Sequence, residues 1–201
     1  MENNEIRSFN VDIEHDNESR LLRGYAIVFN SPTRINKKIE EVIEPQSLNG
    51  VLEKSDIFAL YEHAKNRGIL ARSNQGTGTL ALVVDDKGLA FEFEAPRTQL
   101  GDEVLEMVRR GDINKCYFAF RCSKGGYTVR KQSDGTYLRT IQQFDQLFDI
   151  SIVSQPAYPT TSVEIKRSIE EIEEQEAKEA REELEQYYKE LKTIYLGKWT
   201  A

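Results

Sequence analysis

Alternating apolar and polar positions predict a series of short strands along most of the chain. The run from Leu22 to Phe29 is the first, and the turn residues Asn30-Ser31-Pro32 end it. The strands at 79–84 and 89–94 flank a short polar loop, which predicts a hairpin with Gly88 in the left-handed conformation. The predicted strands are residues 22–29, 57–62, 79–84, 89–94, 116–122, 127–131, 137–141 and 148–153.

Two other segments of this region have helical patterns. Residues 100–110 have one apolar face and acidic residues in the first turn, and Gly111 follows the last turn. Residues 45–52, which begin at a proline, predict a second, shorter helix. Short strands with a few flanking helices indicate an α+β fold, built around a partly or fully closed antiparallel β-barrel.

The chain changes character at residue 164. Residues 164–190 hold eleven glutamates against five lysines and arginines, and apolar residues recur every three or four positions. This pattern predicts a long amphipathic helix with a phase slip between Ile172 and Ala180. The sequence therefore divides into a domain at 1–163 and an acidic helical tail at 164–201. Two interpretations of the tail stay open: a docking or scaffolding arm, and a solvated acidic helix.

Composition argues against several classes of function. The net charge of −7 over 201 residues does not fit a general nucleic-acid binder, which carries a basic surface. Two distant histidines and two cysteines on one strand supply no metal-ligand cluster. The polar start predicts no signal peptide, and no apolar run approaches the length of a membrane span. Cys116 and Cys122 are expected about 20 Å apart on one strand, too far for a disulfide, which indicates reduced thiols and a cytoplasmic protein.

Candidate chemistry is concentrated on the strand that follows Gly111. Because successive side chains of a strand point to opposite faces, Cys116 shares a face with Phe118 and Phe120, and Tyr117 points to the other face. The pattern predicts that Cys116 is a small buried hydrophobe. Only a β-bulge at this point would turn its thiol to the face of Tyr117.

Two further residues are candidates for proton transfer. His63 stands at the end of a predicted strand, whereas His15 lies in a polar segment that predicts a solvated turn. Imidazole can accept a proton near neutral pH, so His63 is the candidate base. Asp149 lies on the strand at 148–153, where its carboxylate either orients an imidazole or keeps a strand edge from pairing.

An ordered series of motifs covers residues 20 to 163. The motifs are RGYAIVFN at 23–30, IEPQSL at 43–48, ALYEH at 59–63, ILARS at 69–73, GTL at 78–80, DKGL at 86–89, RRGDI at 109–113, DISIV at 149–153 and PAYP at 156–159. In this order they resemble the prohead (capsid maturation) proteases of tailed phages, which are relatives of the herpesvirus assemblins. The resemblance implies an assemblin-like β-barrel and serine-type acyl transfer with a histidine base.

The resemblance also assigns the candidate site residues. The family carries a serine nucleophile immediately before a Phe-(Gly/Ala)-Phe sequence, and Tyr117 holds that place here. A phenol is a poor acyl-transfer nucleophile, and its ring fills space that a scissile carbonyl needs. His63 corresponds to the general base and Asp149 to the acidic third member of the triad. Cys116 is the alternative nucleophile, and strand alternation points it away from His63.

Three functions follow as alternatives. The first is an active prohead protease that cleaves scaffold, major capsid protein and itself inside the assembling procapsid, in the host cytoplasm. The second is a catalytically dead protease-fold protein with a structural role in capsid assembly. The third is an unrelated β-barrel interaction module. Related viral proteases suggest a homodimer. The net charge and the lack of a long apolar run predict no nucleic-acid or membrane partner. The family resemblance also implies no cofactor, because backbone amides can stabilise an acyl-transfer intermediate.

Overall fold

The computed structural model describes residues 4–9, 13–15, 19–154 and 163–197. The chain forms two compact units, residues 1–162 and residues 163–201. The first unit holds strands β1 to β14 and helix α1 (Gln99–Arg109), and the second holds helix α2 (Val163–Gly197). Within the described ranges, no helix is both long enough and apolar enough to cross a membrane.

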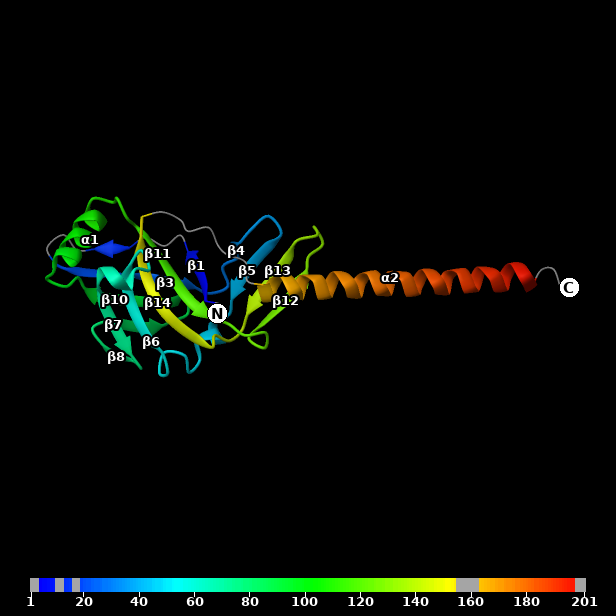
Figure 1. The fold of residues 1–201 in the computed structure, drawn as a ribbon, viewed down its shortest axis with the longest axis horizontal. Coiled ribbons are helices and arrows are strands. Elements are labelled where there is room, and N and C mark those ends of the chain that lie inside the picture. The colour runs from blue at the N-terminus through cyan, green and yellow to red at the C-terminus, as the bar shows by residue number, and fades with distance from the viewer. Residues whose placement is uncertain (1–3, 10–12, 16–18, 155–162, 198–201) are drawn as a thin grey trace. The chain divides into compact units, whose positions relative to one another are not determined.

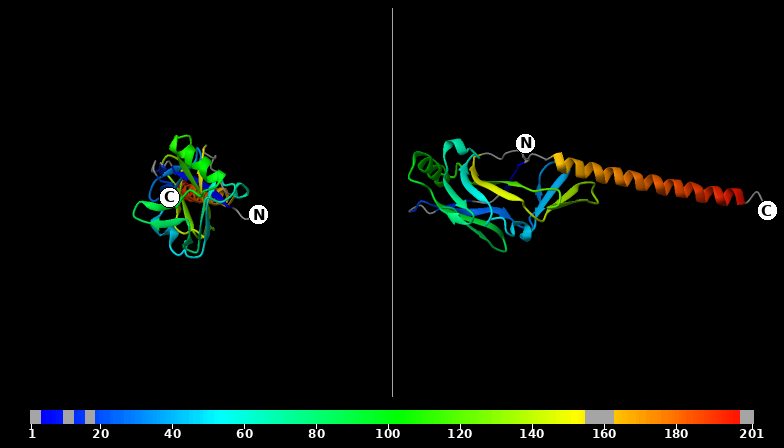
Figure 2. Two further views of the ribbon diagram at one scale, coloured as in Figure 1. Left: turned by 90° about the vertical axis from the view of Figure 1, so that its left-hand side faces the viewer. Right: turned by 60° about the horizontal axis from the view of Figure 1, so that its bottom comes forward.

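Three sheets build the first unit (Figure 1). A six-stranded sheet has the order β1-β11-β14-β6-β7-β8, and two four-stranded sheets have the orders β2-β3-β10-β9 and β12-β13-β5-β4. Helix α1 lies at one end of this unit and the β12–β13 hairpin at the other (Figures 1 and 2). The strands are β1 (Glu5–Phe9), β2 (Glu14–His15), β3 (Leu21–Val28), β4 (Thr33–Arg34), β5 (Ile39–Ile43), β6 (Asp56–Tyr61), β7 (Ala71–Asn74), β8 (Thr77–Gly78), β9 (Ala81–Val84), β10 (Gly88–Glu94), β11 (Lys115–Arg121), β12 (Tyr127–Lys131), β13 (Tyr137–Ile141) and β14 (Gln146–Val153).

In the part of the chain that the structure describes, the strands do not form the closed antiparallel barrel that the sequence predicted. Over the described residues they form three sheets, and two neighbouring pairs are parallel, β6 with β14 and β5 with β13. Parallel neighbours need a long crossover connection, so they join strands that are far apart in the sequence. Local alternation of side chains carries no information about such pairing. The α+β class is therefore confirmed, and three sheets with two parallel pairs are found where a partly or fully closed antiparallel barrel was expected.

Helix α1 forms as its sequence predicts. Its buried face contains Val104, Leu105 and Val108. The side chain of Thr98 accepts a hydrogen bond from a first-turn amide at 3.2 Å and so caps the N-terminus. At the other end Gly111 has a φ of 76°, the left-handed conformation that ends many helices. The helix end in turn sets the point at which β11 begins.

Three local predictions differ from the structure. Residues 45–52 hold a short 3-10 helix, Pro45–Leu48, and not a longer helix. His15 lies in β2 and pairs with β3, so it is not in a turn. Gly88 is required by close packing and not by a left-handed φ, because a Cβ there would lie 1.9 Å from the carbonyl oxygen of Ile27. Only for Gly88 does the deciding contact, with Ile27, come from a distant part of the chain.

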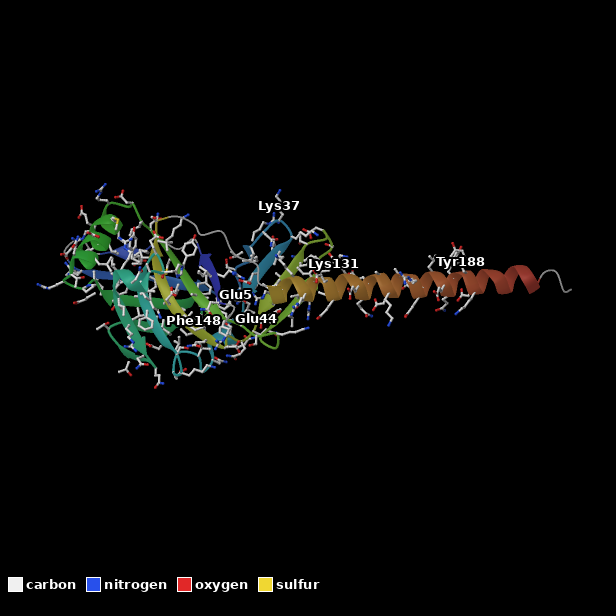
Figure 3. The ribbon with its side chains drawn as sticks, in the orientation of Figure 1. Glu5, Lys37, Glu44, Lys131, Phe148 and Tyr188 are labelled. Carbon is white, nitrogen blue, oxygen red and sulfur yellow. The ribbon has the colours of Figure 1, made fainter. Side chains whose placement is uncertain are left out.

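Strands β1 and β5 are missing from the predicted set because charged side chains occupy their buried positions. An inward-facing charge breaks the apolar alternation from which strands are predicted. Four ion pairs of 2.5–2.7 Å join these side chains, so each buried charge meets an opposite one. We call them the charge cluster, and Glu5 is labelled in Figure 3. Its members are Glu5 and Arg7 on β1, Glu41 on β5 and Arg139 on β13.

Candidate active site

The candidate side chains lie on neighbouring strands of the six-stranded sheet. Strand β11 pairs with β14 in the antiparallel sense, and β14 pairs with β6 in the parallel sense. In this register Tyr117 is opposite Ser151, and Asp149 is opposite both Ala119 and Phe58. Paired residues share a face of the sheet, with Cβ atoms about 4.5–5.5 Å apart. The topology therefore brings Tyr117, Asp149 and the end of β6 together.

Cys116 lies on the opposite face of β11 and packs in the hydrophobic core. Its side chain is fully buried. The pairing of β11 with β14 is regular from Lys115 to Ala119, so no bulge turns the thiol toward the face of Tyr117. Burial, helped by the negative charge of Asp149, raises the pKa of the Cys116 thiol well above its usual range. The thiol therefore stays protonated and unreactive in the folded chain.

A bulge in β14 determines the face on which Asp149 lies. Ala119 pairs with Asp149, but the next residue of β11 pairs with Leu147, so Phe148 is an extra residue in β14. Phe148 is labelled in Figure 3. Strict alternation would put Leu147 and Asp149 on one face. The bulge instead leaves Leu147 in the core and turns Asp149 to the face that carries Tyr117.

Two consecutive left-handed residues place His63 beyond the end of β6. Glu62 has a φ of 53° and His63 a φ of 54°, conformations that cost energy for residues other than glycine. The end of β14 holds this turn. The Glu62 amide donates to the Ile152 carbonyl at 3.1 Å, and the Glu62 carboxylate accepts from the Ser154 amide at 2.8 Å and hydroxyl at 2.7 Å. These contacts offset the strain and fix the position of the backbone from which the His63 imidazole extends.

The imidazole of His63 is bound to the carboxylate of Asp149. Nδ1 of His63 lies 2.6 Å from Oδ1 of Asp149, and the hydroxyl of Ser151 donates to the same oxygen at 2.7 Å. The His63 ring meets the Tyr117 ring edge to face, with centroids 6.2 Å apart and planes at 86°. A carboxylate at Nδ1 favours the tautomer with its proton there, which leaves Nε2 as the nitrogen that can accept a proton.

Two polar atoms of this site are buried without a hydrogen-bond partner among the described residues. They are Nε2 of His63 and the hydroxyl oxygen of Tyr117. Buried polar atoms are nearly always paired in proteins, so an unpaired one calls for an explanation. Nε2 is available as a proton acceptor, and the side chain that meets the His63 ring is the phenol of Tyr117.

The structure adds Ser151 and Glu62 to the site, and the sequence analysis singled out neither. The i, i+2 spacing of Asp149 and Ser151 puts both on one face of a strand, which could have indicated their contact. The contact of Glu62 with Ser154 joins positions 92 apart and has no local signal. The PAYP motif at 156–159 lies outside the described residues. In the part of the chain that the structure describes, no three histidine, cysteine or acidic side chains gather as a metal site requires.

A histidine whose Nδ1 is held by an aspartate carboxylate is the base and orienting pair found in hydrolases with a catalytic triad. The sequence comparison agrees with this class. The chain belongs to the caudovirus prohead serine protease family, whose model matches residues 7–175. The match includes His63, Tyr117 and Asp149. The family that the sequence motifs indicated is therefore confirmed.

Two other comparisons complete the picture. Comparison with curated protein sequences gives no match. Among solved structures, the chain is similar to the bacteriophage T4 capsid assembly protease, with a TM-score of 0.43 and 8% sequence identity. That similarity covers 76% of this chain and 98% of the T4 chain.

Proposed function

We propose that this chain is a prohead maturation protease in which the base and its orienting carboxylate are assembled and the nucleophile position is blocked. His63 is the general base, Asp149 orients it, and Tyr117 stands where the family's serine acts. The observation that carries the proposal is the 2.6 Å contact between His63 and Asp149, made beside the Tyr117 ring. Membership in the prohead protease family supports the role in capsid maturation.

Tyr117 blocks acyl transfer for two reasons. A phenol is a weaker nucleophile toward a peptide bond than an activated alcohol or thiolate. Tyr117 is also only 1% exposed, and its ring fills the space beside His63. A scissile carbonyl has to come within about 3–3.5 Å of the attacking atom, and the ring prevents this approach. Cys116 offers no substitute, because its thiol is on the core side of the strand.

A serine at position 117 completes the reaction. Its oxygen forms a bond to the scissile carbonyl carbon while its proton passes to Nε2 of His63. The imidazolium gives this proton to the leaving amine as the C–N bond breaks. A water oxygen then bonds to the acyl carbon and its proton passes to Nε2. The serine oxygen leaves and takes that proton back, while Asp149 stabilises the imidazolium in both halves of the reaction.

The substrates that suit this role are the scaffold and the major capsid protein, together with the chain itself. A chain with serine at position 117 would cut them inside the assembling procapsid, in the host cytoplasm, and the resemblance to related viral proteases favours a homodimer. No cofactor is needed, because proton transfer and backbone amide donors are sufficient for acyl transfer.

The test is co-expression of the chain with its cognate capsid and scaffold proteins, read by intact mass. We expect the unmodified chain to leave both proteins intact and Tyr117→Ser to cut them. Tyr117→Ala is a matched control, since it opens the same space without a nucleophile. Tyr117→Ser combined with His63→Ala is a second control, since it lacks the base. Both controls are expected to be inactive.

Two results would contradict the proposal. If Tyr117→Ser is folded and leaves both substrates intact, the assigned triad is wrong. If the unmodified chain cuts and Cys116→Ala stops it, the thiol is the nucleophile and the assignment of strand faces fails.

A structural role in capsid assembly is the second candidate, and helix α2 favours it. Leu184, Tyr187 and Tyr188 are large side chains that are more than half exposed on this helix. Exposed apolar side chains that lie close together mark interaction surfaces. The same co-expression separates the two functions. A purely structural protein enters the prohead and never cuts, even as Tyr117→Ser.

A further inference from the structure

Ser151 makes a second hydrogen bond to the carboxylate that holds the candidate base. Its hydroxyl donates to Oδ1 of Asp149 at 2.7 Å, and the same oxygen lies 2.6 Å from Nδ1 of His63. Ser151 is fully buried, so bulk water does not compete for its hydroxyl. One oxygen of the Asp149 carboxylate therefore accepts two hydrogen bonds. One comes from Ser151 on the same strand, and the other comes from His63 in the turn after β6.

The register of the sheet places Ser151 directly opposite the nucleophile position. Ser151 pairs with Tyr117 across β14 and β11, so both side chains lie on the same face. The hydroxyl of Ser151 nevertheless donates its hydrogen bond to Asp149 and not to the base. This bond makes Ser151 a support for the carboxylate and leaves the nucleophile role at position 117.

The carboxylate needs such a support because of its own freedom. The last torsion of an aspartate is broad, so a single hydrogen bond does not hold the carboxylate plane. Two donors on one oxygen restrict that rotation, and a buried serine on a packed strand is itself held in place. A rotated carboxylate would release Nδ1, and the imidazole could then turn its other nitrogen away from position 117.

We infer that Ser151 is a positioning residue, whose hydroxyl holds the Asp149 carboxylate in the orientation that binds His63. In doing so it keeps Nε2 free for a nucleophile at position 117. The catalytic consequence rests on the proposed function. The contact itself is present in the chain as it stands and can be tested without activity.

The first test uses the full, unmodified chain with 15N-labelled histidine. The hydrogen-bonded Nδ1 proton of His63 gives a downfield NMR resonance, and the two ring nitrogen shifts report the tautomer. Ser151→Ala and Ser151→Cys remove the strong donor, and we expect them to broaden or abolish this resonance. Ser151→Thr keeps a hydroxyl on a residue that suits a strand, and it is expected to preserve the signal. Ser123→Ala is the matched control. It removes a hydrogen bond of 2.5 Å from a serine hydroxyl to the carboxylate of Asp145, outside the site.

The second test repeats the series in the Tyr117→Ser chain with the capsid substrate. Ser151→Ala and Ser151→Cys are expected to lower kcat by about tenfold or more with little change in KM. This is the loss expected for one hydrogen bond to a charged group that acts in the transition state. Ser151→Thr is expected to recover most of the rate. If Tyr117→Ser cuts nothing, the proposed function fails, and the NMR series still decides the role of Ser151.

Two outcomes overturn the inference. One is an unchanged Nδ1 resonance in Ser151→Ala when circular dichroism shows a folded chain. The other is an equal loss in Ser151→Thr and Ser151→Ala, because shape and not the hydroxyl would then be responsible. If Ser151→Ala does not fold, Ser151→Cys and Ser151→Thr decide the question, since both fill the site and only one keeps a strong donor.

Discussion

The first unit contains two polar clusters, one fully buried and one partly buried, that are built in opposite ways. In the charge cluster, two carboxylates and two guanidinium groups are each at most 3% exposed and make four ion pairs. Every charge there has an opposite partner, although one guanidinium nitrogen, Nε of Arg139, has none among the described residues. The second cluster, which we call the His63 cluster, leaves the hydroxyl of Tyr117 and one nitrogen of its base unpaired. It consists of His63, Tyr117, Asp149 and Ser151.

This difference separates a cluster in which every charge is paired from one that leaves a nitrogen of the candidate base free, as the proposed function requires. Buried charges are tolerated when they are paired, and removal of any one leaves the others uncompensated. Unpaired buried atoms lower stability, and they persist where a reacting group needs a partner. The two clusters are also connected. The charge cluster holds β1 against β5 and β13, and β1 pairs with β11, the strand that carries Tyr117.

The largest effect is expected from opening the charge cluster. Arg139→Leu leaves two buried carboxylates to share Arg7, and we expect it to lower the free energy of unfolding by about 3–5 kcal/mol. Urea unfolding followed by circular dichroism measures the change. The matched control is Arg34→Leu, which removes an exposed ion pair with Glu40 in the same sheet. It is expected to cost less than about 1 kcal/mol. An equal loss of unfolding free energy from the two substitutions would show that the charge cluster does not stabilise the packing of these sheets.

A smaller effect is expected from the protonation of Glu41 in acid, because this removes one charge of the cluster and leaves every side chain in place. Burial alone would raise the pKa of Glu41, but the guanidinium groups of Arg7 and Arg139 outweigh it and hold that pKa below its usual range. The unfolded chain therefore takes up this proton at a higher pH than the folded chain does. The stability contributed by Glu41 is complete above about pH 4.3 and is lost as the pH falls through the lower folded value.

Urea unfolding between neutral pH and about pH 3 measures this dependence. Glu41→Gln is the comparison, because it cannot titrate. It is expected to be less stable at neutral pH and to lose less stability in acid. An identical acid slope in both chains would mean that other carboxylates account for the loss.

The smallest effect has the opposite sign and concerns the His63 cluster. Tyr117→Phe removes an unpaired buried hydroxyl and keeps the ring, so we expect stability to rise by about 1 kcal/mol. The same change at Tyr25 is the control, because that phenol donates to Asp85 at 2.6 Å and its loss brings no gain. If Tyr117→Phe instead lowers stability, its hydroxyl is paired, and the contrast between the two clusters disappears.

The strands show which parts of the fold the sequence pattern can predict and which it cannot. Strands β12 and β13 were predicted at their observed bounds, because side-chain alternation and a turn between two strands are local properties. Strand β5 was missed, because Glu41 faces inward and interrupts the apolar pattern. Its burial makes sense only beside Arg7 and Arg139, which come from two other strands.

The sequence by itself determined the protease family, the end of α1 at Gly111, and the opposite faces of Cys116 and Tyr117. The family follows from the order of motifs along residues 20–163. The helix end and the two strand faces depend on spacing over a few residues, which helix capping and strand alternation convert directly into geometry. Only the tertiary structure decided that Asp149 reaches His63, a contact between positions 86 apart. It required a parallel strand pair, a bulge at the residue before Asp149 and a left-handed turn held from β14. Such pairing depends on the energy of the whole sheet, and no local stretch of residues encodes it.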